Sequence, residues 1–456
     1  MNIFGSFGFG RIGGKKNRRG LHKIIAIVLS ISLCVCAVSV YTPVFADYSI
    51  PSYLRIGLFY GANEKSEVTL SSEHGFYFGT YSGTDFTQTG STNAKEIKVA
   101  FTNGGVAATS GGSVVYKADD AAVGLGIFPT VGGMERRLKI DGIEYRGGLD
   151  FKTVNGKNVI TNVVFMNNYL YGVISREMSP SWAQEALKAQ AVCARTFTYG
   201  QMKNDTYARY GANLDDSISY QAYHATTSYE VTDQAVADTA GMVMTYKGKL
   251  ADCYYYSTSP GYSENLEVWN AASPGYLLAE NHTREKTKDL SSDKAFHKFI
   301  TAKADAYDEN SPYFRWTATL SAKLGMDETY GKLKKLKVNK RSTSGYVLSL
   351  TMVFEKGERT IEKENEIRYA LGKYLLDLDL ADGTNKHRAS SVPSACFEIK
   401  SQKKGTIVLT GGGFGHGIGM SQYGADAMGK EGKKWQEILG FYFKDVTFTN
   451  VFDLDT

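Results

Sequence analysis

Proline and cysteine are scarce in this chain of 456 residues. Only 8 prolines stand beside 48 glycines and 30 tyrosines, a balance that argues against a disordered, low-complexity chain and is typical of a β-rich protein with many turns. Three of the 5 cysteines, Cys193, Cys253 and Cys396, follow residue 46, and no CxxC pair is present. Three widely spaced cysteines do not make a disulfide framework, so we expect small, buried, apolar side chains at these positions.

A net charge of one sign is also lacking once the N-terminus is set aside. The formal charge of the whole chain is +5, but residues 1–46 contain six basic residues and no acidic one. The rest of the chain has 46 basic and 47 acidic residues. No overall field therefore favours nucleic acid as a partner.

The N-terminus has the pattern of a targeting segment. The basic run KKNRRGLHK is followed by the apolar residues 24–46, and the small residues Val44 and Ala46 resemble a signal peptidase site. We predict that residues 1–46 are a signal peptide or a membrane anchor, with cleavage and retention both open. The protein is then exported, and it is extracellular, in the cell wall, or anchored and facing outward, with membrane contact only through this segment.

The remaining pattern predicts an α+β fold. Residues 47–160 form a β-rich region, because runs such as YLRIGLFY and EIKVAFTNGG alternate between apolar and polar residues and are separated by glycine-rich turns. Residues 161–450 form a mixed α/β core with an insertion near 275–345. The alanine-rich run after Pro180 predicts a slim helix that begins in a capping box of Ser181 and Gln184, and further helices are expected in 228–241 and 362–372.

The first candidate for chemistry is Glu177, in the segment REMSP. A carboxyl group beside the apolar Met178 and Trp182 can act as a general acid if burial disfavours its charged form. A glutamate at a loop is, however, often only a solvated surface group or a helix cap.

The second candidate is the stretch GGGFGHGIGMSQYG, residues 411–424, in which seven of fourteen residues are glycine. Glycines permit positive φ and the close approach of a ligand, and His416, Ser421 and Gln422 add polar groups. A phosphate loop is the rival interpretation, but no Lys-Ser/Thr pair follows the glycines. A glycine-rich turn with a hydrogen-bonded structural histidine is the other alternative.

The third candidate is DCYYYSTSPGYSEN, residues 252–265. On a strand, Tyr254 and Tyr256 point to one face and Tyr255 to the other. Aromatic rings beside Ser257 suit stacking and hydrogen bonding to sugars, although half-buried aromatic residues are also common in sheets.

Together these segments resemble the SpoIID/LytB domain family, which includes stage II sporulation protein D and amidase-enhancer proteins. The family pattern YLxGVVxxEM, with a tryptophan and an EALKAQAVAARTYA helix after it, appears here as YLYGVISREMSPSWAQEALKAQAVCARTFTYG. The element GWGHGVGMSQWGA appears as GFGHGIGMSQYGA, and the aromatic run before SSGGxTEN and a tryptophan appears as YYYSTSPGYSENLEVW. The resemblance spans roughly residues 53–450, with gaps around 60–130 and 275–310, and predicts a SpoIID-like core with a saccharide groove.

The resemblance implies a peptidoglycan lytic transglycosylase of the sporulation protein D type. Such an enzyme cuts glycan strands, prefers strands without stem peptides, leaves anhydro-muramic ends and uses no cofactor. The family's catalytic glutamate corresponds to Glu177. One carboxyl group suffices because a hydroxyl of the sugar is the nucleophile, whereas hydrolysis by two carboxylates needs a second acid. The saccharide is expected to lie against the glycine-rich backbone and to contact Gln190, Arg195, Tyr255, Ser257, His416, Ser421 and Gln422.

One departure from the family concerns zinc. Some members carry a zinc-binding cluster of cysteine and histidine after the slim helix, but residues 214–230 here contain His224 and no cysteine, so we predict no metal. The alternative function is a non-catalytic amidase enhancer that binds wall glycan and stimulates a hydrolase, since enhancers share these motifs. Either function implies peptidoglycan as the partner, and the family suggests other wall hydrolases or sporulation and engulfment proteins as well.

Overall fold

The computed structural model describes residues 52–130, 136–203, 205–217, 221, 223 and 228–454. The predicted targeting segment and His224 lie outside these residues. In the part that is described, no helix combines the length and the apolar character that crossing a membrane requires.

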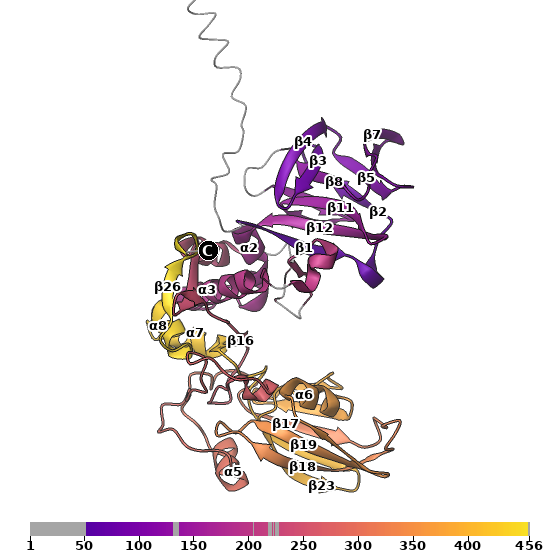
Figure 1. Cartoon of the computed structure of the whole chain (residues 1–456). Coiled ribbons are helices and arrows are strands. Elements are labelled where there is room, and N and C mark those ends of the chain that lie inside the picture. Colours follow the sequence, from indigo (N-terminus) through magenta and orange to yellow (C-terminus); the bar gives the residue numbers. More distant parts are fainter. Residues whose placement is uncertain are drawn as a thin grey trace, which may run out of the picture. The chain divides into compact units, whose positions relative to one another are not determined.

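The N-terminal region is β-rich, as predicted, and its strands form two sheets (Figure 1). The first contains, in spatial order, β13 (Leu214–Asp215), β1 (Tyr53–Phe59), β12 (Lys157–Phe165), β11 (Gly148–Val154), β8 (Leu125–Pro129), β3 (Phe76–Ser82) and β4 (Asp85–Thr92). The second contains β10 (Ile143–Arg146), β9 (Arg137–Ile140), β2 (Glu67–Ser71), β5 (Glu96–Phe101), β6 (Val106–Ser110) and β7 (Ser113–Ala118). A short 3-10 turn, η1 (Gly61–Asn63), is the helical element that the structure describes between residues 52 and 165.

Alternation of side chains explains why these strands pair as they do. In β5, Ile97 and Val99 are buried while Glu96 and Lys98 are exposed, so one face of the strand is apolar. Buried residues of both sheets belong to one hydrophobic core. Leu54 of β1, in the first sheet, and Leu70 of β2, in the second, are examples. The two sheets therefore share their apolar faces, as in a β-sandwich.

A helical part follows the sandwich directly, because β12 continues into α2 (Met166–Glu177). It contains α3 (Gln184–Gln201), α4 (Glu230–Asp238), α7 (Gln422–Lys430) and α8 (Trp435–Tyr442), with the strands β15 (Lys249–Leu250), β14 (Met242–Tyr246) and β26 (Thr447–Asn450) in one sheet. The helix α3 is slim, as expected. A Cβ added to Gly429 of α7 would lie 2.7 Å from the Cβ of Ala183, so the two helices approach closely.

The predicted capping box of α3 is wrong. The helix begins at Gln184 with Ala183 as its N-cap, and no side chain of that N-cap accepts a hydrogen bond. The backbone N–H of Ala183 donates instead to the Asp426 carboxylate of α7, at 2.9 Å. Asp426, distant in sequence, thus accepts the N-cap N–H bond that the predicted capping box assigns to Gln184.

Residues between Trp316 and Leu409 form a second hydrophobic core. This core continues beyond residue 345, where the sequence predicts the end of the insertion. One sheet has the order β22 (Asn385–His387), β21 (Leu375–Leu380), β17 (Trp316–Ser321), β24 (Thr406–Gly411) and β23 (Phe397–Lys403), and another has β18 (Leu333–Arg341), β19 (Val347–Phe354) and β20 (Glu358–Ile361). Two helices, α5 (Asp293–Thr301) and α6 (Glu364–Gly372), accompany them. The whole is α+β, as the sequence predicts.

Candidate active site

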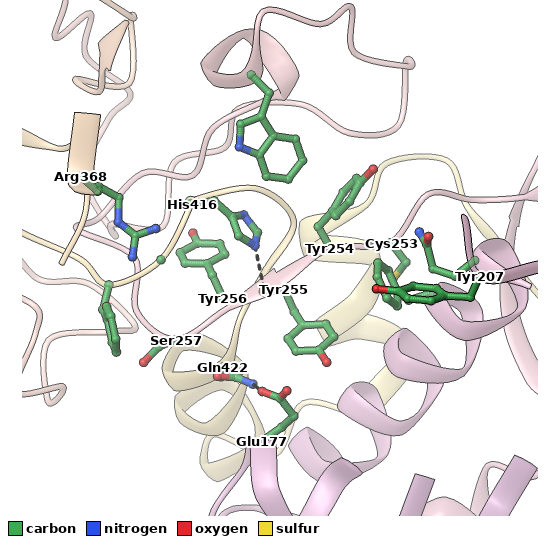
Figure 2. Close-up of a pocket in the computed structure, with 15 residues that line it drawn as sticks. Glu177, Tyr207, Cys253, Tyr254, Tyr255, Tyr256, Ser257, Arg368, His416 and Gln422 are labelled. Carbon is green, nitrogen blue, oxygen red and sulfur yellow. Dashed lines mark hydrogen bonds between the residues drawn. The ribbon is translucent and has the colours of Figure 1, made fainter. Parts of the chain in front are cut away.

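A cavity of about 920 Å³ collects residues from distant parts of the chain. Figure 2 shows the side chains that surround it. They come from the end of α2, the end of α3, η3 (Asp205–Tyr210), β16 (Tyr255–Tyr256), η4 (Leu266–Trp269), α6, the glycine-rich stretch and the start of α7. The lining residues are Glu177, Phe197, Gln201, Tyr207, Cys253, Tyr254, Tyr255, Tyr256, Ser257, Trp269, Arg368, Phe414, Gly415, His416 and Gln422.

Glu177 is the last residue of α2, where the chain turns to extended backbone at Met178. Its side chain is partly exposed and lines the cavity. The Gln422 amide, from the first turn of α7, donates to its Oε2 at 3.3 Å (Figure 2). Glu177 and Gln422 are 245 residues apart in the sequence, so the fold joins two of the segments that the sequence singled out.

The three adjacent tyrosines, Tyr254 and the two residues of β16, divide between two sides, as predicted. The rings of Tyr254 and Tyr256 lie 6.3 and 5.6 Å from the His416 ring. Tyr255 points away from them, and its hydroxyl donates to Oε1 of Gln221 at 3.1 Å. Burial, and after it the negative charge of Glu177, raises the pKa of Tyr255 well above its usual value, so this hydroxyl stays protonated.

His416 is held by the backbone on both sides of its ring. The N–H of Ile418 donates to Nδ1 at 3.0 Å, which requires that the neutral ring carries its hydrogen on Nε2. Nε2 then donates to the carbonyl of Tyr255 at 2.9 Å (Figure 2). Burial, with a contribution from the nearby Arg368, lowers the pKa of His416 to about 4. Both ring nitrogens of His416 are thus engaged by backbone atoms in this structure, and its contact with a saccharide stays a prediction.

The glycines serve contacts within the protein itself. Gly419 has φ of +77°, and an added Cβ would lie 2.2 Å from the carbonyl oxygen of Tyr254. Gly415 has φ of +115°, and an added Cβ would lie 2.7 Å from the Cβ of Tyr256. The stretch wraps the tyrosine segment, and the strands β16 and β25 (Met420–Ser421) pair in parallel. Close approach is required, as expected, but the neighbour of the backbone is the tyrosine segment.

Three residues expected at the groove do not line the cavity: Gln190, Arg195 and Ser421. Arg195 is buried, and its guanidinium donates to the carbonyls of Val236, Thr239 and Met242 at and beyond the end of α4. It satisfies carbonyls that the helix leaves unpaired. Gln190 is fully buried, and its amide atoms have no hydrogen-bond partner in the described structure.

Ser421 is the N-cap of α7. Its Oγ accepts from the N–H of Gly424 at 3.4 Å, and it donates to the carboxylate of Asp308. Asp308 is fully buried, and burial raises its pKa to about 7. These bonds fix the start of α7. Its first residue, Gln422, follows Ser421 directly and donates to Glu177.

The sequence prediction omitted several residues that do line the cavity, above all Trp269 and Arg368. The Trp269 ring lies 5.2 Å from His416 and 5.1 Å from Tyr254, so an aromatic wall surrounds the histidine. Trp269 ends the tyrosine motif, and Arg368 belongs to the predicted helix at 362–372. Membership of these two segments is the sequence feature that could have pointed to both residues. No pattern within residues 362–372 indicates, however, that α6 lies at the cavity.

No group of three or more His, Cys, Asp or Glu side chains is placed to hold a metal ion within the ranges that the structure describes. Charged groups at the cavity are few. Among its described lining residues, Glu177 is the carboxylate and Arg368 is the cation.

The fold and the cavity thus define an α+β protein with one carboxylate in an aromatic, partly enclosed site. Comparison with known proteins gives the family. A family model for stage II sporulation protein (SpoIID) matches residues 154–246, and a domain of unknown function (DUF8618) matches residues 263–419.

Curated relatives agree. Stage II sporulation protein D of Bacillus subtilis (strain 168) is 31% identical over 295 residues, which is 61% of this chain and 73% of the relative. The protein of the same name from Bacillus amyloliquefaciens is 30% identical, over 62% of this chain and 73% of the relative. The amidase enhancer of Bacillus subtilis (strain 168) is 27% identical over 69% of this chain, which spans less than half of that relative, 45%. The chain belongs to the SpoIID family.

Proposed function

We propose that the protein is a peptidoglycan lytic transglycosylase that uses Glu177 as both acid and base. The observation that carries this proposal is that Glu177 is the one carboxylate among the described residues lining the cavity. A glycosidase that hydrolyses with two carboxyl groups needs them about 5 to 9.5 Å apart across the bond. A transglycosylase needs one, because the nucleophile belongs to the substrate.

The reaction is an internal displacement on the muramic sugar. Protonated Glu177 gives its proton to the glycosidic oxygen while the bond from C1 to that oxygen breaks. The C6 hydroxyl of the same sugar attacks C1, and the Glu177 carboxylate takes the hydroxyl proton. Water is not consumed, and the products are a free 4-hydroxyl end and a 1,6-anhydro end.

The surroundings of Glu177 suit these roles. It ends α2, so the negative end of the helix dipole lies beside the carboxyl group. Gln422 can hold the carboxylate by its amide N–H at 3.3 Å without supplying a competing proton. Tyr254, Tyr256 and Trp269 offer ring faces and edges to a sugar, as is common in saccharide sites.

The test is cleavage of glycan strands without stem peptides. We expect anhydro-muramic products from the native protein and a loss of at least about 1,000-fold in Glu177→Gln, which keeps the size and hydrogen bonding but not the proton transfer. Glu73→Gln is the matched control, since the Glu73 side chain is 92% exposed. Equal activity of the Glu177 variant and the native protein would refute the proposal.

The second candidate is a non-catalytic amidase enhancer, favoured by the likeness to the protein of that name. It predicts that neither native protein nor Glu177→Gln forms products, that both bind glycan, and that both stimulate a wall amidase. Both candidates place the protein outside the cell membrane, in contact with peptidoglycan.

A further inference from the structure

We propose that Arg368 forms an anion subsite of this cavity and binds the free lactyl carboxylate of a muramic acid residue. This inference rests on the proposed function, because it names the part of a glycan strand that the site selects. The observation behind it is a guanidinium that lines the cavity and is held in place by two other groups.

Arg368 is oriented before any ligand arrives. Its Nε donates to the carbonyl of Val392, and its Nη1 donates to Oε2 of Glu364, both at 3.3 Å. Glu364 is itself only 3% exposed, and its other oxygen accepts from the Trp269 indole at 3.2 Å. A fixed guanidinium loses little conformational entropy on binding, which favours recognition.

Part of the guanidinium remains available. The two bonds use the Nε hydrogen and one Nη1 hydrogen, so both hydrogens of Nη2 and one of Nη1 have no partner among the described residues. The side chain is 14% exposed and lines the cavity. Two adjacent N–H groups of this kind match the two oxygens of a carboxylate.

The charge distribution at the cavity favours an anion beside Arg368. Glu364 does not line the cavity, so a ligand meets the cation and not its buried partner. The positive charge is felt locally, since it contributes to the lowered pKa of His416. In Figure 2 the side chains of Tyr256 and Ser257 lie between Arg368 and Glu177. A ligand that fills the cavity can thus meet a proton donor at one place and a cation at another.

Peptidoglycan provides one anion of this geometry on its glycan strand. N-acetylglucosamine is neutral, whereas muramic acid carries a lactyl ether whose carboxylate is free when no peptide is attached. A neutral sugar hydroxyl has no need of a guanidinium. Arg368 would therefore distinguish a strand with free carboxylates from one in which the carboxyl group is an amide, whether a simple amide or the first bond of a peptide.

The experiment compares two strand preparations of the same length, one with free lactyl carboxylates and one with each carboxyl group converted to the primary amide. Rates and dissociation constants are measured for the full native chain, Arg368→Gln, Arg368→Lys and the control Arg359→Gln, whose side chain is exposed and outside the cavity. We expect native protein and control to have a KM about 10-fold or more lower for the carboxylate strands. Arg368→Gln should lose this preference by a rise in KM on carboxylate strands alone, with kcat little changed, and Arg368→Lys should keep part of it.

Equal KM values of the native protein for the two preparations would overturn the inference, and so would an equal loss on both in Arg368→Gln. If the native protein cuts neither preparation, the proposed reaction fails. The dissociation constants then still decide whether the cavity prefers the carboxylate. If Arg368→Gln unfolds, as thermal denaturation would reveal, the comparison of the two preparations with native protein remains decisive.

Discussion

Cys193 and Cys253 are placed to form a disulfide bond. Both are buried and their Sγ atoms lie 2.6 Å apart, closer than two sulfur atoms that share no bond normally approach. Cys193 is in α3, and Cys253 immediately precedes Tyr254. A bond between them would tie the central helix to the tyrosine segment at the cavity.

The size of the effect follows from the loop that the bond would close. The cysteines are 60 residues apart, and the loss of chain entropy in the unfolded state predicts a stabilisation of about 4 kcal/mol for a loop of this length. Burial raises the pKa of the Cys253 thiol well above its ordinary value. Little thiolate is then present in the folded protein, so exchange there is slow, and the bond should form most readily when the chain refolds with oxidised glutathione.

The assay is hydrogen exchange of α3 amides, measured by mass spectrometry at increasing denaturant on protein refolded with and without reductant. We expect protein refolded without reductant, with oxidised glutathione present, to be 2 Da lighter per bond and its α3 amides to open with a free energy about 4 kcal/mol higher. Cys396→Ala should keep the difference and Cys193→Ala should abolish it. An unchanged opening free energy in protein shown by peptide mapping to contain the bond, or no bond between these two cysteines, would refute the reasoning.

Three further predictions concern stability. Burial raises the pKa of Asp308 from 3.8 to about 7, so the folded state keeps a proton that the unfolded state loses, and the free energy of unfolding should fall across that pH range. Denaturation measured from pH 4 to 8 should show this fall in the free energy of unfolding for the native protein and not for Asp308→Asn. Burial lowers the pKa of His282 from 6.5 to about 3, so the unfolded state holds a proton there that the folded state lacks. This makes the free energy of unfolding rise with pH and partly offsets the fall due to Asp308. His282→Phe should therefore make the fall steeper. Gly419→Ala should lower the free energy of unfolding by at least about 2 kcal/mol, because it adds both strain and a clash. Gly432→Ala has open space and a similar positive φ, so it should lose only about 1 kcal/mol, and equal losses would contradict the packing argument.

Patterns along the chain predicted much of the fold. The strands of the sandwich follow from alternation, as in β5, and the helices α3, α4 and α6 follow from their composition. Ser181 and Gln184 have the spacing of a capping box, but the box does not form. The N–H at the helix start donates instead to Asp426 of α7. Sequence spacing does not reveal a competitor of that kind.

At the candidate site, too, local motifs predict some residues and miss the roles of others. Glu177, Tyr255 and Gln422 could be found because each lies in a long motif, and the structure brings them to one cavity. The role of a short polar side chain is less visible: Ser421 caps a helix instead of facing the cavity.

Two other residues depend on contacts that only the fold creates. Both nitrogens of His416 bind backbone atoms. Arg368 reaches the cavity from α6, 191 residues after Glu177 in the sequence, a distance that no local pattern can bridge.

The most direct test of a single acid and base is the origin of the oxygen at the new sugar end. Glycan strands without stem peptides are digested in water enriched in ¹⁸O, and the products are weighed by mass spectrometry. Our account predicts anhydro-muramic ends that carry no ¹⁸O and that disappear in Glu177→Gln. Reducing ends that contain ¹⁸O would show that water is the nucleophile and would contradict it.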